Sequence, residues 1–510
     1  MPSATQVFKQ IPIPYRHLLF LLIFLVAVFF RFWNLAVAPY YEWDEPVYTS
    51  IGANVARTGD IRVKTEIGAV EPVYLYHPPF HFLLLGGWFE RFGMSIEIAR
   101  ILAAAMSTVT LAILFFFLIA YDRGRDGGAL IALFLLGIDS WMVFSNRVGW
   151  IENTMMPIGI MGLWVYDSAL KAETTQYWRF ALAGALLSAV SIYKHVGLYF
   201  LLMVPICWVI NGRKDIKAHA LLAATAGGLI FAYIFAMVTI YGDFFIDHYT
   251  VQIRRTFGLQ HSRGVVESFN HLITAITGNY RIYAGMMITA LIAFGFFIGK
   301  IYLAIRHRTL AVLQDNAVLF SCTAASLVFF GSISLKIPHY YLMVLVPLYA
   351  FAAMETVGLV RRNPIHRKMI SAVLSLIFLI NVFALFDLFG SAQQNAGADL
   401  KRYFDASEPI NAAVITEETI GTLIRQPYFK IGRFQRHLYN GDFRKHRPSL
   451  LVTYESITQK IPDNPELALL IDKSTVIQEF SDFKCRLKVY RIPEGLWSTD
   501  ELKLQNLQSE

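Results

Sequence analysis

The chain has few charged residues and few cysteines. Only 16% of its 510 residues are Asp, Glu, Lys or Arg, and its three cysteines, Cys207, Cys322 and Cys485, lie far apart. This spacing excludes a disulfide framework and a cysteine-based metal site. The sequence has no Asn-x-Ser/Thr acceptor for N-glycosylation, which disfavours a eukaryotic secretory-pathway protein. It also has neither internal repeats nor low-complexity segments.

Apolar residues dominate the composition. Hydrophobic residues make up 55% of the chain and aromatic residues 15%, with a mean hydropathy of +0.47. A soluble globular protein is far less apolar. The formal net charge of +8 is not gathered into a Lys/Arg tract with interleaved aromatics, so no nucleic-acid partner is predicted. The composition predicts a polytopic membrane protein.

Long apolar runs mark the expected membrane spans. A helix needs about 20 apolar residues to cross the hydrocarbon core, because its backbone polar groups must be satisfied internally. By this criterion we expect about 11 transmembrane helices. They cover residues 17–33, 98–120, 128–145, 154–170, 179–193, 196–210, 218–241, 282–305, 315–335, 338–357 and 370–390.

Basic residues in short loops assign the two sides of the membrane. They occur in every second loop between the expected spans, as the positive-inside rule predicts for cytoplasmic loops. Counting the apolar stretch HPPFHFLLLGGWFERFG, residues 77–93, as another span would invert every later loop, so we expect it to lie along or dip into the outer surface. The cytoplasmic set comprises Lys9, Arg16, Arg123, Arg125, Lys171, Arg179, Arg213, Lys214, Lys217, Arg306, Arg308, Arg361, Arg362, Arg367 and Lys368.

The composition changes after the last apolar run. Residues 391–510 are mixed and polar, and they contain the strand-like pieces AAVIT, SLLVTY and RLKVYRI among helical and turn signals. We therefore predict an all-α membrane domain over residues 1–390, with a cytoplasmic N-terminus and a structured external loop over 34–97 that carries juxtamembrane helices. A small α/β extracytoplasmic domain over 391–510 follows it, and Cys485 should be outside the cell.

Under this topology, polar residues that are scattered in the sequence meet at the outer end of the helix bundle. Cations in short outer loops oppose the positive-inside rule, so their presence there indicates a bound anion. The set comprises Asp44, Glu45 and His77 in the first loop, Arg147, Glu152 and Asn153 in NRVGWIEN, Lys194 and His195 in YKHVG, Arg254 and Arg255 in the loop over 242–280, and Lys336, His339, Tyr340 and Tyr341 in LKIPHYY.

Most of these residues also have a purely structural explanation. Asp44 and Glu45 match the cap and the first-turn acid of a helix that begins there. Arg147 could form a structural ion pair with Glu152 or with Asp139. Lys194 and His195 could be ordinary interfacial residues, and Arg254 and Arg255 could be solvated loop charges. Tyr340 and Tyr341 could belong to an aromatic belt at the membrane interface.

Several motifs occur in an order that resembles the GT-C membrane glycosyltransferases. They are DEPVYTSIGANVARTGD, YHPPFHFLLLGGWFERFG and EIARILAAAMSTVTLAILF near the N-terminus, the Arg-with-acid element NRVGWIEN, and KIPHYYLMVLVP before a late span. The similarity covers roughly the first 360 residues and is closest to the branch of protein O-mannosyltransferases and lipid A aminoarabinose transferases. The C-terminal domain resembles no particular family.

The resemblance implies an inverting transfer of a sugar from a polyprenyl-phosphate donor to a hydroxyl outside the cytoplasm, in a bacterial or archaeal plasma membrane, with no obligatory metal or other cofactor. Asp44 would be the general base, and Glu45 would orient the acceptor or tune its neighbour. The donor phosphate would bind Arg147, Lys194, Arg255, Lys336 and Tyr340. Residues that contact the acceptor or support this site would be His77, Glu152, Asn153, His339 and Tyr341.

Two other functional classes fit a polytopic membrane protein. A transporter or flippase of lipid-linked sugars would usually have internal repeats and polar groups near the midplane, whereas here the polar set lies at one face. A surface-polysaccharide polymerase or ligase would usually carry its catalytic residues in a large late loop. The acidic pair in the first loop favours the glycosyltransferase. The sequence leaves the sugar and the acceptor, whether protein, lipid or glycan, open.

Overall fold

The structure is a computed structural model, and it forms two compact units. Unit 1 consists of Met1–Trp33, Leu75–His81 and Arg100–Leu388, and unit 2 of Asn34–Tyr74, Phe82–Ala99 and Phe389–Glu510. The residues that the structure describes are 13–35, 44–61, 77–122, 126–212, 215–256, 280–332, 340–362, 365–391, 396–406, 414–416, 428–430, 447–453, 465–481 and 486–498.

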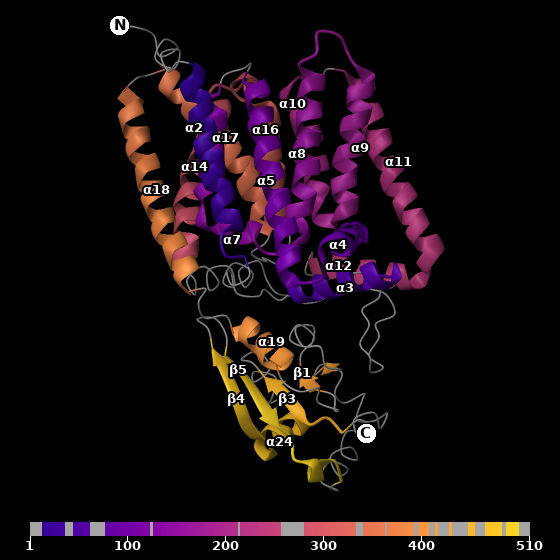
Figure 1. The fold of residues 1–510 in the computed structure, drawn as a ribbon. Coiled ribbons are helices and arrows are strands. Elements are labelled where there is room, and N and C mark those ends of the chain that lie inside the picture. The colour runs from indigo at the N-terminus through magenta and orange to yellow at the C-terminus, as the bar shows by residue number, and fades with distance from the viewer. Residues whose placement is uncertain are drawn as a thin grey trace. The chain divides into compact units, whose positions relative to one another are not determined.

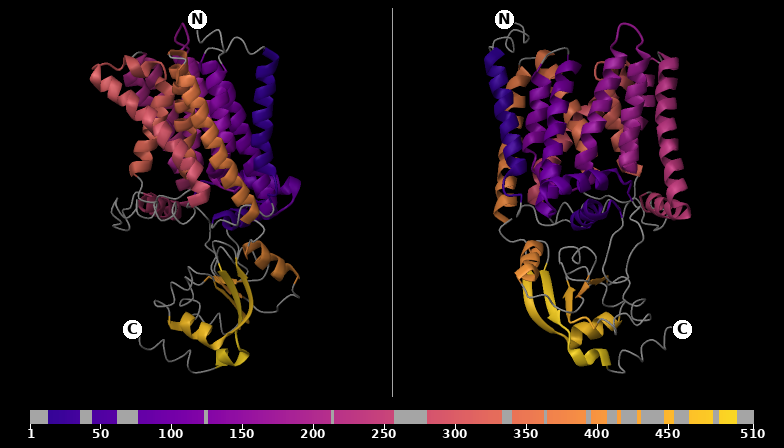
Figure 2. Two further views of the ribbon diagram at one scale, coloured as in Figure 1. Left: turned by 90° about the vertical axis from the view of Figure 1, so that its left-hand side faces the viewer. Right: turned by 45° about the vertical axis from the view of Figure 1, so that its right-hand side comes forward.

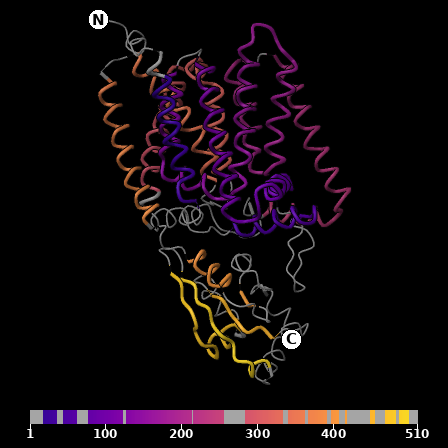
Figure 3. Tube along the Cα trace, viewed as in Figure 1, coloured from indigo at the N-terminus to yellow at the C-terminus, as the bar shows by residue number. Residues whose placement is uncertain are grey.

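Unit 1 is a bundle of long helices that run side by side (Figure 1, Figure 2). Figure 3 shows α8 and α9 as antiparallel neighbours joined by a short turn, and the two helices pack against each other. The elements are α2 (Ile13–Phe32), α5 (Ile96–Tyr121), α6 (Gly127–Ile138), α7 (Ser140–Asn146), α8 (Ile151–Leu170), α9 (Tyr177–Tyr193), η1 (His195–Leu198), α10 (Tyr199–Ile210), α11 (Ile216–Tyr241), α12 (Asp243–Thr256), α14 (Tyr280–Arg306), α15 (Ala311–Gln314), α16 (Ala317–Ser332), α17 (Tyr341–Arg362) and α18 (Ile365–Ser391).

Within the described residues, the eleven apolar segments expected to span the membrane fall on helices; residues 333–335 and 338–339 of two of these segments lie outside the described part of the chain. The third, residues 128–145, is broken into α6 and α7, which meet at a bend of 67°. By length and hydropathy alone, five helices among the described residues could cross a membrane, or six if the bent pair counts as one span. The multi-pass helical architecture is thus confirmed, while the number of crossings stays a prediction.

The apolar stretch at residues 77–93 does not form a span. It folds into α4 (Phe80–Phe92), whose 13 residues extend about 20 Å at a rise of 1.5 Å per residue. The hydrocarbon core is about 30 Å thick, so a helix of this length cannot cross it.

Large apolar side chains cover the outer faces of the peripheral helices. Phe231, Phe235, Leu291, Phe383 and Phe386 are each more than 60% exposed. Only 17–22% of the apolar windows of α11, α14 and α18 is buried, against 78% for α17. Exposed apolar surface on this scale fits contact with lipid, and α17 is a central helix of the bundle.

Unit 2 contains a five-stranded mixed sheet. Its strands are β1 (Val414–Thr416), β2 (Tyr428–Lys430), β3 (Leu450–Thr453), β4 (Thr475–Ser481) and β5 (Arg486–Arg491), in the order β2-β1-β3-β5-β4. The strands β2, β1 and β3 run parallel, and β5 pairs antiparallel with β3 and β4. The strand-like pieces AAVIT, SLLVTY and RLKVYRI therefore coincide with β1, β3 and β5, which confirms the small C-terminal α/β region.

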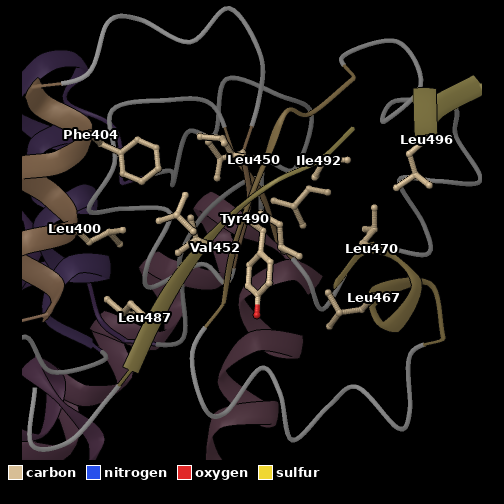
Figure 4. Close-up of a cluster of buried hydrophobic side chains, with 14 of the residues drawn as sticks. Leu400, Phe404, Leu450, Val452, Leu467, Leu470, Leu487, Tyr490, Ile492 and Leu496 are labelled. Atoms are coloured by element: carbon tan, nitrogen blue, oxygen red, sulfur yellow. The ribbon is translucent and has the colours of Figure 1, made fainter. Parts of the chain in front are cut away.

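A hydrophobic core holds this sheet to its helices, α19 (Ala396–Ala406), α24 (Pro465–Lys473) and η4 (Glu494–Ser498). Every residue of β3 is buried, as expected for an inner strand with both faces covered. Leu400 and Phe404 of α19 lie on one side of the cluster and Leu467 and Leu470 of α24 on the other (Figure 4). The predicted domain division at residue 390 stays a prediction.

Unit 2 also holds the helix that carries the acidic pair. The helix α3 (Asp44–Thr58) begins at Asp44, as the sequence predicts. It packs closely on α4 at two glycines: a Cβ on Gly52 would lie 2.6 Å from Leu85 Cγ, and one on Gly86 would lie 2.4 Å from Val55 Cγ1. This close packing fixes the axis of α3, and with it the position of its first turn relative to α4.

Candidate functional site

The helix ends in unit 1 bring a buried ion pair together. Lys194, between α9 and η1, places its ammonium 2.6 Å from the Glu152 carboxylate in the first turn of α8, and the two side chains are 1% and 0% exposed. The Lys194 Nζ also lies 5.3 Å from the centroid of the Tyr340 ring. Burial of a charge is costly unless it is paired, so this site contains a desolvated ammonium held by a carboxylate and an aromatic face.

Histidines surround this ion pair. The rings of His77 and His195 are nearly parallel, with centroids 6.4 Å apart. His81 places Nδ1 3.0 Å from the hydroxyl of Thr154, which itself donates to the Ile151 carbonyl at 2.8 Å. The hydroxyl proton is used in that bond, so we assign the ring proton of His81 to Nδ1. Burial, together with the charge of Lys194, lowers the pKa of His81 to about 3, so the ring is neutral at pH 7.

Two buried arginines each donate to backbone carbonyls at the end of another helix. Arg31, at the end of α2, is fully buried and donates to the carbonyls of Leu136 (2.9 Å) and Gly137 (3.2 Å) at the end of α6. Arg147, after α7, donates to the carbonyls of Phe30 (2.6 Å) and Trp33 (2.5 Å) at the end of α2. Each guanidinium therefore satisfies carbonyls that the helix cannot satisfy itself.

An amide network fixes the turn between α7 and α8. Arg31 donates to the side-chain oxygen of Asn146 at 3.1 and 2.8 Å, and Asn146 in turn donates to the side-chain oxygen of Asn153 at 3.0 Å. The amide of Asn153 closes the turn by donating to the carbonyls of Ser145 (2.8 Å) and Val148 (2.9 Å). This network positions the turn from which Arg147 and Glu152 extend.

Asp139, which sits at the break between α6 and α7, accepts from Met142 N at 2.9 Å and from the Tyr349 hydroxyl at 3.0 Å. These contacts make Asp139 the cap of α7. They also give each of its two carboxylate oxygens a hydrogen-bond donor, without an ion pair to Arg147.

The structure brings part of the predicted site together. Lys194 pairs with Glu152 and lies 5.3 Å from the centroid of the Tyr340 ring, and Arg147 and Asn153 lie where α7 ends and α8 begins. Glu45 is fully buried and Asp44 partly buried in the first turn of α3, which belongs to unit 2. Among the other predicted residues, His77 stacks near His195, and the ring centroid of Tyr341 lies 5.9 Å from that of Trp141. Arg254 and Arg255 lie on α12, and Arg254 is exposed. Lys336 and His339 lie outside the described residues.

Sequence reasoning missed Arg31, His81 and Asn146. Arg31 had a signal, because it is a lone charge in the last turn of an otherwise apolar span, where such residues usually have a specific partner. Within the described residues, no group of three or more His, Cys, Asp or Glu side chains could hold a metal ion. The expectation that no metal is obligatory stays a prediction.

Solved structures share this architecture over most of the chain. ArnT from Cupriavidus metallidurans bound to undecaprenyl phosphate aligns with a TM-score of 0.60 and 14% identity, over 92% of this chain and 97% of ArnT. This chain has the GT-C fold. The oligosaccharyltransferase AglB from Archaeoglobus fulgidus, in complex with an inhibitory peptide and a dolichol-phosphate, aligns with a TM-score of 0.54 and 11% identity, over 87% of this chain and 69% of AglB.

The GT-C fold confirms the fold class that the sequence motifs predicted. ArnT in the apo state aligns similarly, with a TM-score of 0.57 over 93% of this chain and 98% of ArnT. No protein-family model and no curated protein sequence matches the chain. At 10–14% identity these alignments show a shared fold, and the function has to be argued from the side chains.

Proposed function

We propose that this protein is an inverting glycosyltransferase that moves a sugar from a polyprenyl-phosphate-linked donor to a hydroxyl acceptor on the extracytoplasmic side of the membrane. The observation that carries the proposal is the buried ammonium of Lys194 in unit 1, since a desolvated cation is suited to a lipid phosphate. The GT-C fold, shared over 92% of the chain with a protein bound to undecaprenyl phosphate, supports it.

Lys194 would stabilise the leaving group. As the bond between the anomeric carbon and the phosphate oxygen breaks, negative charge grows on the lipid phosphate, and a fixed cation in a low-dielectric site stabilises that charge strongly. The ammonium has three N–H donors, of which Glu152 accepts one. Glu152 would hold Lys194 in position and compensate its charge when no phosphate is bound. By resemblance, Arg255, Lys336 and Tyr340 would complete the phosphate site.

Asp44 would act as the general base. In the reaction the acceptor oxygen attacks the anomeric carbon from the face opposite the phosphate, its proton passes to the Asp44 carboxylate, and the polyprenyl phosphate leaves with the bonding electrons. The positive N-terminal end of α3 lowers the cost of placing two acids in one turn. Glu45, which is fully buried, would orient the acceptor or tune its neighbour Asp44.

The test compares membranes of a deletion strain with those of the wild type. Mass spectrometry of polyprenyl-phosphate-linked sugars and of glycosylated lipids, proteins and glycans should show one donor accumulating and one glycosylated product missing in the deletion. Reintroducing the wild-type chain should restore the product, whereas the Asp44→Asn chain, present at the same level, should not. Identical donor and product profiles in deletion and wild type would contradict the proposal.

A further inference from the structure

Aromatic side chains from three helices of unit 1 meet at the start of α17. The ring centroid of Tyr341 lies 5.9 Å from that of Trp141 on α7 and 6.4 Å from that of Tyr283 on α14. Trp141 and Tyr283 stack on each other at 4.7 Å. We refer to Trp141, Tyr283 and Tyr341 as the aromatic cluster. Phe330 on α16 packs edge-on against it, 5.6 Å from Tyr341.

The aromatic cluster contains two buried polar atoms that the described part of the chain leaves unpaired. Trp141 is 2% exposed and Tyr341 6% exposed. Neither the indole nitrogen of Trp141 nor the hydroxyl of Tyr341 has a hydrogen-bond partner among the described residues. A buried donor without an acceptor is costly, and folded proteins retain few of them. At position 341 phenylalanine would keep the ring without this cost, and an apolar ring would fill position 141 without an unpaired N–H, so the two donors need an explanation beyond packing.

Tyr340, the residue before Tyr341, connects the aromatic cluster to the proposed phosphate site. Tyr340 and Tyr341 are adjacent in the sequence, yet their side chains reach different partners. The ring of Tyr340 faces the ammonium of Lys194 at 5.3 Å, whereas the ring of Tyr341 faces Trp141. A donor whose phosphate binds near Lys194 has two groups attached to that phosphate, the prenyl chain and the sugar.

We infer that the aromatic cluster binds the sugar of the donor, with Trp141 and Tyr341 donating hydrogen bonds to sugar oxygens. This inference rests on the proposed function. An indole N–H can only donate, so its ligand must present an acceptor. A prenyl chain has no acceptor and would leave both donors unpaired. A sugar has oxygens for the two donors and C–H faces that pack on aromatic rings.

The test uses full-length protein in lipid nanodiscs and the variants Trp141→Phe and Tyr341→Phe, which remove one donor each and keep an aromatic ring. Dissociation constants are measured for undecaprenyl phosphate, for undecaprenyl phosphate linked to glucose or mannose, and for methyl glycosides of common hexoses and pentoses. Each variant should bind the sugar-bearing ligands about two- to tenfold more weakly, the value of one hydrogen bond, and undecaprenyl phosphate equally well.

A matched control is Tyr199→Phe, which removes a buried hydroxyl on α10 that lies 4.0 Å from the sulfur of Met156. It should leave every dissociation constant unchanged. Stability gives a second measurement at Tyr341, where phenylalanine removes the hydroxyl alone: loss of an unpaired donor should leave the unfolding midpoint of the ligand-free protein unchanged or raise it. A lower midpoint in Tyr341→Phe would show that the hydroxyl has a partner within the protein, and would overturn the inference.

The binding outcomes separate this inference from the proposed function. An equal loss of affinity for undecaprenyl phosphate would assign the aromatic cluster to the lipid phosphate and overturn the inference. Unchanged affinity for all ligands would also overturn it while leaving the glycosyltransferase proposal intact. If the wild type bound methyl glycosides through these residues but no polyprenyl-phosphate lipid, the proposed donor would be wrong and the sugar site would stand. A wild type that bound neither sugar form would contradict the sugar site itself.

Discussion

The buried pair of Lys194 and Glu152 allows a quantitative test of the proposed phosphate site. With 2.6 Å between the charged atoms, Coulomb attraction amounts to about 6 kcal/mol at an effective dielectric constant of about 20. Desolvation of two charges costs several kcal/mol each and offsets most of this gain. The pair therefore adds little net stability, although either charge alone would be strongly destabilising.

The variants Glu152→Gln and Lys194→Met each remove one charge and keep the approximate shape of the side chain. Each leaves its partner charge buried and uncompensated, so the free energy of unfolding should fall by about 3–5 kcal/mol. The double variant buries no charge, and it should recover to within about 1–2 kcal/mol of the wild type. Reversible unfolding in mixed detergent micelles measures all four proteins in one double-mutant cycle.

Binding measurements separate the structural role of the Lys194–Glu152 pair from the proposed role of Lys194 in binding phosphate. The double variant is expected to fold but to bind undecaprenyl phosphate at least about tenfold more weakly, because a charge-assisted hydrogen bond contributes about 1.5–3 kcal/mol. Additive losses in the cycle would show that the two side chains do not interact. Wild-type affinity in the stable double variant would remove Lys194 from the phosphate site.

Three further predictions concern the base, the packing of α3 and a buried histidine. Asp44→Asn should keep the wild-type melting temperature but lose about 10² to 10⁴ in turnover, whereas a capping role alone predicts normal turnover. Gly86→Ala places a Cβ 2.4 Å from Val55 and should lower the free energy of unfolding by about 1–3 kcal/mol. The control Gly87→Ala, with open space around its Cβ, should be neutral or stabilising. Equal effects of the two variants would refute the packing argument. The unfolded pKa of His81 is about 6.5 and its folded pKa about 3, so between these values the unfolded state binds more protons, and the free energy of unfolding should decrease as the pH is lowered, by up to about 1.4 kcal/mol per pH unit. The variant His81→Gln should reduce the dependence of the unfolding midpoint on pH between pH 7 and pH 4, and an unchanged dependence would refute the assignment.

The sequence predicted the fold well because the relevant signals are local. A membrane helix requires a long apolar run wherever it occurs, so the expected spans fall on helices. The strands β1, β3 and β5 likewise follow from short runs of β-branched and apolar residues between polar segments. The bend between α6 and α7 was not predicted. Asp139, whose side chain caps the start of α7, lies within an otherwise continuous apolar run, so the run looks like one helix in the sequence.

The candidate site was less predictable because its contacts are non-local. Lys194 and Glu152 were both selected from the sequence, but for different roles. Their pairing depends on how α8 packs against α9, because the two residues are separated by 42 positions in the sequence. Tyr340 and Tyr341 looked equivalent in the sequence, since consecutive aromatics near a helix start can point in any of several directions. Only the packing of α7 and α14 around α17 separates the ring that faces Lys194 from the ring that faces Trp141.

The capping of helix ends by arginines changes which cation of this site is the better candidate for binding phosphate. A cation that opposes the positive-inside rule suggested an anion ligand, yet Arg147 donates to the backbone carbonyls of Phe30 and Trp33 at the end of α2, and Arg31 of α2 likewise caps α6. Carbonyl groups at a helix C-terminus carry partial negative charge, so they attract an arginine for the same electrostatic reason that a phosphate does. Among the described residues, the contacts of the Lys194 ammonium differ in kind, because they are a carboxylate and an aromatic face. Of the two cations, Lys194 is therefore the stronger candidate for the phosphate, and loss of function in an Arg147 variant has to be separated from loss of the α2–α7 connection.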